Sequence, residues 1–220
     1  MRLINGTSEP EFVIAAGQIE RWRIVNASSA RYVRLSLGGL PFQIIGTDGG
    51  LIEAPVTAEE VLLPPGDRVE LAVGPFENEG EVYGIDDLPF YRGTGKKHVE
   101  RFGTIRIAPR KTSTARIPPR LREFAPLVTE TASVTRTVKV GFELSLRRGF
   151  DFVIDGERHH HAEPVNVGEL QVWDVINVPP KATVRIAWYP DDRPGMWMYH
   201  CHILEHHAAG MMAHFEVKRP

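Results

Sequence analysis

The feature that most constrains the fold of this chain is an internal repeat. Two blocks occur twice and in the same order: residues 4–6 with 17–26 match 154–156 with 168–177, and residues 64–72 match 179–187. In each long block a Gly and an Asn stand nine positions apart, and a Trp precedes the Asn by four. Matched blocks in one order indicate two homologous domains that share one fold.

The repeated segments have the pattern of β-strands. Apolar and polar residues alternate over 21–24, 68–73, 104–107 and 183–187, and the chain contains 20 Gly and 17 Pro to form turns between them. Short strands separated by turns are typical of β-sandwiches and barrels. We therefore predict an all-β protein with domains at 1–110 and 134–220, joined by a linker over 111–133 that includes Pro118 and Pro119.

The two copies of the repeat differ in length. Asn26 and Pro64 are 38 positions apart, whereas their counterparts Asn177 and Pro179 are only two apart, so the second copy is 36 residues shorter. A strand with its turn takes roughly a dozen residues, since strands themselves average about 5–6. The second domain as written is therefore expected to lack about three strands.

Charge and composition exclude several classes of protein. A net charge of −2 gives no support to a nucleic-acid or anionic-membrane partner. No apolar run reaches the roughly 18–20 residues of a membrane span, and the first residues lack the apolar core of a signal peptide. The single cysteine excludes an intrachain disulfide and every multi-cysteine zinc site.

That cysteine lies in the segment richest in metal-binding side chains. His200, Cys201 and His202 end a strand-like stretch, and His206 and Met211 follow across a short turn. If the strand continues to His202, the two histidines project from one face and Cys201 from the other. A thiolate, an imidazole and a thioether are three of the four ligands of a blue-copper centre.

Three other interpretations of Cys201 remain open. It is an inert buried thiol, a zinc ligand together with His200 or His202, or half of a Cys-His nucleophilic pair. The surrounding histidines weigh against the first interpretation. Adjacent strand residues point apart, which suits one tetrahedral zinc site poorly, and no oxyanion hole is recognisable. Copper is therefore the favoured interpretation.

The stretch from His200 to His206, with Met211, resembles the C-terminal copper motif of the multicopper oxidases, the laccase group. Residues 42–50 and 63–68 resemble the copper-free middle domain of the same family. The resemblance implies two cupredoxin-like Greek-key β-sandwich domains, which correspond to the second and third domains of a three-domain oxidase.

The resemblance also implies roles for individual residues. Cys201 and His206 would bind type 1 copper with Met211 as axial ligand, while His200 and His202 would bind the type 3 pair. Electrons would pass from Cys201 to the flanking imidazoles. The implied activity is one-electron oxidation of phenols, aromatic amines or metal ions, coupled to reduction of O2 to water. A secreted or periplasmic location is expected on the same ground.

Other ligands of the family have no counterpart here. They lie in two His-x-His pairs of a first domain and in a His-Pro-x-His-x-His stretch that falls within the 36-residue difference. A missing domain or a homo-oligomer would have to supply them, yet residues 1–110 of a second copy contain only His98. We therefore expect no four-electron reduction of O2 by this chain alone. The alternatives are a non-catalytic copper-binding or structural module and a metal-free interaction domain.

The remaining histidines are expected to lie outside the copper site. His159, His160 and His161 are expected in a solvated loop, with weak metal binding as the alternative. His98 is expected at the surface, and His207 and His214 at the surface or in packing contacts.

Overall fold

In the computed structural model the chain divides into two units, Met1–Phe124 and Ala125–Pro220. The structure describes residues 2–90, 98–123, 137–147, 149–167, 178–179, 181–184 and 193–219. Over these residues the helix α1 (Leu204–Ala208) is the single helix among strands, which confirms the all-β prediction. No helix in the described part is long and apolar enough to cross a membrane.

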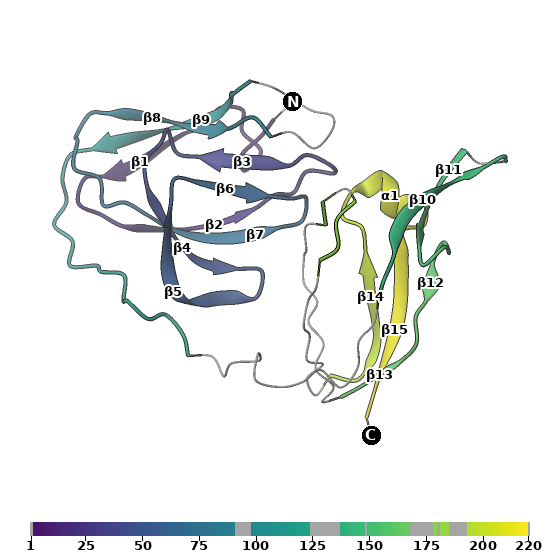
Figure 1. Cartoon of the computed structure of the whole chain (residues 1–220). Helices are drawn as coiled ribbons and strands as arrows, with labels where there is room; N and C mark the ends of the chain where they lie inside the picture. The colour runs from purple at the N-terminus through teal and green to yellow at the C-terminus, as the bar shows by residue number, and fades with distance from the viewer. Residues whose placement is uncertain are drawn as a thin grey trace. The chain divides into compact units, whose positions relative to one another are not determined.

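Unit 1 is built from two β-sheets (Figure 1). One sheet has the order β1 (Glu11–Ala15), β9 (Glu100–Ala108), β8 (Val82–Asp87), β3 (Val33–Ser36) and β6 (Glu60–Leu63). The other has the order β2 (Glu20–Val25), β7 (Arg68–Val73), β4 (Phe42–Thr47) and β5 (Gly50–Ala58). Strand β1 pairs with β9 in parallel, and every other pairing is antiparallel.

The core of unit 1 lies between these sheets. Ile14 and Ile105 from the first sheet and Phe42 and Leu71 from the second are almost completely buried in one cluster. Alternate residues of each strand supply these side chains because successive strand residues face opposite sides. The alternating segments 21–24, 68–73 and 104–107 form parts of β2, β7 and β9, as predicted. The fourth segment, 183–187, extends outside the described residues.

The start of the predicted linker lies against unit 1. The backbone N–H of Leu121 donates to the carbonyl oxygen of Glu53 in β5 (2.8 Å), and Arg120 forms an ion pair with the Glu53 carboxylate. Arg120 and Leu121 are therefore tied to β5. The rest of the predicted linker, 124–133, lies outside the described residues.

Unit 2 is organised around its last strand, β15 (Met212–Lys218). β14 (Gly195–His200) pairs with one edge of β15 in antiparallel fashion, and β12 (His160–His161) and β13 (Val165–Asn166) pair with the other edge in parallel. A hairpin of β10 (Val140–Ser145) and β11 (Gly149–Ile154) completes the described elements. Ile154 of this hairpin packs against the buried side chains of Met211 and Ala213.

The structure corrects the expectation of a solvated loop at residues 159–161. His160 and His161 form β12 and lie opposite Ala213 and His214 of β15. The N–H of His159 donates to the carbonyl oxygen of Gly210 (3.0 Å). The loop prediction was wrong for His160 and His161, because their backbone polar groups pair with the edge of β15. His159 lies in a turn, and His159 and His161 are exposed as expected. The second copy of the long repeat, 168–177, lies outside the described residues, so the deficit of three strands stays a prediction.

Candidate functional site

The five side chains singled out in the sequence lie at the junction of β14, α1 and β15. Two backbone hydrogen bonds close this junction: Cys201 N–H donates to the Met211 carbonyl oxygen, and Met211 N–H donates to that of His206, both at 3.0 Å. The first turn of α1 places His206 back over the end of β14. The backbone bonds that bring Cys201, His206 and Met211 to one place therefore join residues that are close together in the chain.

The thiol and the imidazole are in direct contact. Cys201 Sγ lies 3.5 Å from His206 Nδ1. The His206 ring stacks on Phe152 of β11, with ring centroids 4.0 Å apart and an angle of 16° between the planes. Cys201 and Phe152 both pack against the small core that contains Met211. The Phe152 ring therefore holds the imidazole in the orientation that faces the sulfur.

Burial raises the pKa of the Cys201 thiol, and this outweighs the opposing effect of its backbone hydrogen bond at Ile203. Cys201 therefore keeps its proton at neutral pH when no metal ion is present. A thiolate is the form that binds a metal, so metal binding would release this proton.

The imidazole rings of His200 and His202 lie close to each other. Their ring centroids are 4.8 Å apart, and Nδ1–H of His200 donates to the carbonyl oxygen of Cys201 (3.1 Å). β14 ends at His200, so the strand does not continue to His202 as the sequence argument assumed. The bend after His200 still leaves the two imidazoles as neighbours.

Sequence reasoning missed two residues that shape this site. The ring of His207 lies 4.4 Å from that of His200, and desolvation, followed by the charges of His200 and His159, lowers the pKa of His207. His206 and His207 are consecutive on a helix, and consecutive helical residues point about 100° apart. One ring therefore faces Cys201 and the other faces His200. The second missed residue is Phe152, for which the sequence carries no signal because β11 is far from His206 along the chain.

The donor set on the Cys201 side suits copper. A thiol, an imidazole and a thioether are soft or intermediate ligands, which select copper over magnesium or calcium. In the described ranges no group of three or more His, Cys, Asp or Glu side chains is placed to hold a metal ion. The third candidate donor, beside the Cys201 thiol and the His206 imidazole, is therefore the Met211 thioether.

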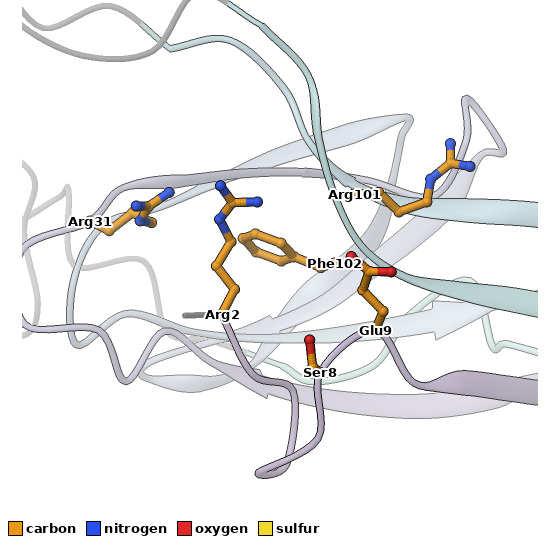
Figure 2. Close-up of a pocket in the computed structure, with 6 residues that line it drawn as sticks. All are labelled: Arg2, Ser8, Glu9, Arg31, Arg101 and Phe102. Atoms are coloured by element: carbon orange, nitrogen blue, oxygen red, sulfur yellow. The ribbon is translucent and has the colours of Figure 1, made fainter.

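Unit 1 has a pocket of its own (Figure 2). It has a volume of about 270 Å³ and is lined by Arg2, Ser8, Glu9, Arg31, Arg101 and Phe102. Arg2 and Arg31 both form ion pairs with Glu100, at 2.6 and 3.0 Å. Arg101 is bonded to Asp86 at 2.8 Å, which raises the pKa of its guanidinium. Acidic neighbours thus already compensate the arginine charges, so the pocket is no specific anion site.

Comparison with known proteins decides the family. A family model described as multicopper oxidase matches residues 2–117, and a second model with the same description matches residues 146–220. The chain belongs to the multicopper oxidase family. Members of this family use copper and couple a reductant to O2, so the copper expectation is confirmed at that level.

Individual relatives agree with this assignment. The multicopper oxidase LPR1 homolog 1 of Oryza sativa subsp. japonica is 30% identical over 188 residues, which are 80% of this chain and 32% of the relative. The cell division protein FtsP of Xenorhabdus nematophila is 32% identical over 130 residues, 58% of this chain and 26% of the relative. This multicopper oxidase chain thus spans about a third of the length of these relatives or less.

Solved structures show the same architecture. A variant of the McoA multicopper oxidase of Aquifex aeolicus superposes with a TM-score of 0.83 at 26% identity, covering 98% of this chain and 59% of that one. The multicopper oxidase of Campylobacter jejuni gives 0.73 at 24% identity, with 99% and 57% covered. The cupredoxin-like fold predicted from the sequence is therefore confirmed.

Proposed function

We propose that this chain is the electron-accepting part of a laccase-like multicopper oxidase, with an incomplete set of copper ligands. One observation carries the proposal: the Cys201 thiol and the His206 imidazole are 3.5 Å apart, and the Cys201 backbone is bonded to Met211. Cys201, His206 and Met211 would hold type 1 copper. His200 and His202 would belong to the type 3 pair.

Copper bound at these residues supplies one-electron redox chemistry. The protein's own residues keep the ligands in place and shield part of their surface from water. Phe152 covers one face of the His206 ring, and Met211 is only 8% exposed. A ligand set with few alternative rotamers loses little conformational entropy when the metal binds. This supports a site that is formed before copper arrives.

The Cys201 main chain would connect the two copper sites. Its carbonyl oxygen accepts a hydrogen bond from the His200 ring, and its side chain contacts His206. One residue thus contacts imidazoles of both proposed sites. The reductant would be a phenol, an aromatic amine or a low-valent metal ion, and O2 would be the final acceptor in the assembled oxidase.

The proposal is tested by adding Cu(II) to the purified protein and recording the visible spectrum. A type 1 site gives intense blue absorption that Cys201→Ser abolishes and Met212→Leu retains, because Met212 faces away from the sulfur. O2 uptake with a phenolic donor is expected to stay at background for the chain alone. Colourless binding of copper would contradict the type 1 assignment, and sustained O2 uptake would contradict the incomplete ligand set.

A second function is favoured by one comparison. FtsP of Photorhabdus laumondii, whose name describes a cell division protein, is 43% identical over 72 residues of this chain. A structural module with a cupredoxin-like fold and no oxidase activity would produce this similarity. Failure to bind copper at micromolar concentration, with the fold intact by circular dichroism, would favour this second function.

We extend the proposal to domain identity and location. Residues 1–110 would be the copper-free middle domain and 134–220 the C-terminal copper domain, with 111–133 between them. A secreted or periplasmic location would match the oxidising, copper-handling role inferred above.

A further inference from the structure

We propose that Arg158 positions His206 and Met211 around the copper centre. Its guanidinium caps the end of α1, the helix that carries His206 and leads into Met211. The inference rests on the function proposed above, because these two residues are assigned there as copper ligands. It adds a residue from outside the motif, since Arg158 lies far upstream of Cys201 in the sequence.

The helix α1 is weakly stabilised by its own residues. It is five residues long (Leu204–Ala208), and none of the five is buried. Its N-cap residue, Ile203, makes no side-chain capping hydrogen bond within the described residues. A helix this short is marginal in water, so its geometry depends on contacts with other parts of the fold. The position of His206 therefore depends on those contacts as well.

Arg158 supplies such a contact at the C-terminal end of α1. Its Nε–H donates to the carbonyl oxygen of Ala209, the C-cap residue, at 2.8 Å. The last carbonyl groups of a helix lack partners within the helix, and a cation there also compensates the negative end of the helix dipole. The N–H of His159 donates to the next carbonyl oxygen, that of Gly210 (3.0 Å). Residues 158 and 159 thus bind two consecutive carbonyl groups directly before Met211.

The aliphatic part of Arg158 also restricts this turn. A Cβ atom built on Gly210 would lie 2.9 Å from Cβ and 3.0 Å from Cγ of Arg158, so the arginine stem packs directly on the glycine backbone. Glycine is the most permissive residue, and this close contact limits the conformations that the turn can adopt. Met211 follows the turn, and its backbone is bonded to those of His206 and Cys201. A displaced turn would therefore affect all three candidate ligands.

Arg158 is itself held by Asp151 of β11. The Asp151 carboxylate lies 3.7 Å from Nε of Arg158, and Asp151 is only 9% exposed. A partly buried ion pair is screened by salt much less than an exposed one. The next residue of β11, Phe152, stacks on the His206 ring. β11 thus supports the α1 segment at two points: Phe152 contacts it directly, and Asp151 acts through Arg158.

This arrangement bears on the copper chemistry through the thioether. In blue-copper sites the axial ligand tunes the reduction potential. Met211 follows the turn that Arg158 holds, so loss of the guanidinium is expected to loosen this ligand. A weaker thioether stabilises Cu(II) less, and the reduction potential of bound copper is then expected to rise.

The test compares Arg158→Leu and Arg158→Lys with Arg101→Leu in the full chain, with circular dichroism as the check of folding. Leucine keeps the Cβ and Cγ atoms that pack on Gly210 but donates no hydrogen bond, whereas lysine restores a charged donor. Arg101 is the matched control because its Nε also binds a buried carboxylate, that of Asp86 (2.8 Å), and its guanidinium packs on Gly84. Arg101 belongs to unit 1, whereas the candidate ligands belong to unit 2.

The metal-free protein is measured first, with ¹³C-labelled methionine methyl groups. Arg158→Leu is expected to shift or broaden the Met211 resonance and to raise several-fold the rate at which the Cys201 thiol reacts with a disulfide reagent. Arg158→Lys is expected to restore most of both values, and Arg101→Leu to change neither. Asp151→Asn is expected to act in the same direction as Arg158→Leu but less strongly, and it replaces that variant if leucine prevents folding. An unshifted Met211 resonance with an unchanged thiol rate would overturn the proposal.

The copper-loaded protein separates this proposal from the function proposed above. Arg158→Leu is expected to remain blue, with a displaced absorption maximum and a raised reduction potential, whereas Arg101→Leu is expected to match the unmodified protein. An unchanged maximum and potential in Arg158→Leu would overturn the positioning role. A colourless unmodified protein would refute the type 1 assignment, and the metal-free measurements would then decide the role of Arg158 by themselves.

Discussion

Gly210 stands where the copper motif turns back into β15, and its replacement by alanine tests how tightly this turn is packed. Its φ angle is +113°, in a region that side chains rarely adopt. A Cβ atom built there would lie 2.7 Å from Nε and 2.9 Å from Cβ of Arg158. Arg158 cannot simply swing away, because its Nε–H donates to the carbonyl oxygen of Ala209 (2.8 Å).

The expected loss has two parts. The positive φ costs an alanine about 1–2 kcal/mol. Crowding against Arg158 adds about 1–3 kcal/mol, the usual cost of overpacking. Gly210→Ala should therefore lower the free energy of unfolding by about 2–5 kcal/mol. Gly149→Ala is the matched control, because Gly149 has φ +80° but no atom within 4 Å of the added Cβ.

Urea unfolding followed by circular dichroism measures both variants, and the midpoint shift at constant slope gives the loss. A second readout is the reaction rate of the single thiol with a disulfide reagent. Met211 follows Gly210 and accepts the backbone hydrogen bond of Cys201, so a displaced turn should expose the thiol and raise the rate several-fold. If Gly210→Ala costs no more than Gly149→Ala and leaves the thiol rate unchanged, the close-packing argument is wrong.

Three further predictions concern the same site. Phe152→Ala should lower the free energy of unfolding by about 3 kcal/mol, the lower end for such a truncation, and should shift the NMR signals of the His206 ring; unshifted signals would contradict the stacking role. Because burial raises the pKa of Cys201 above its ordinary 9.0, the metal-free thiol should alkylate more slowly at pH 8 than free cysteine. Its contribution to stability is complete below pH 9.0 and is lost as pH rises through the raised pKa. A thiol that alkylates as fast as free cysteine would refute the raised pKa. The pKa of His207 is lowered from 6.5, so its contribution is present above pH 6.5 and is lost as pH falls through the lowered pKa; His207→Asn should flatten that acid limb of the stability curve, and an unchanged limb would show that His207 is not its source.

Much of the proposed type 1 site could be predicted from the sequence because it is local. Cys201, His206 and Met211 lie within eleven consecutive residues, and one strand end, one helical turn and one reversal suffice to bring them together. The contacts of Cys201 with His206 and of His200 with His202 and His207 also join residues that are close together in the chain. The strand boundary was predicted less well, because the bend after His200 depends on the hydrogen bonds to β15.

Contacts between strands were beyond sequence reasoning. Phe152 stacks on His206 because β11 packs beside β15, and nothing in either segment specifies that neighbour. The three-histidine run was misjudged for the same reason: β12 pairs with an edge whose position only the folded sheet defines. Strand register depends on the total burial of a face, which no short window of sequence contains.

The sequence by itself determined the all-β class, the two-fold repeat and the residues that carry copper chemistry, because alternation and short spacing are properties of the local chain. Only the tertiary structure decided which side chains from different strands meet: Phe152 with His206, and Met198 with His214 and His161. The physical reason is that backbone hydrogen bonding is the same in every register. Packing of the buried face selects one register, and that choice also sets which residues gather on the outer face.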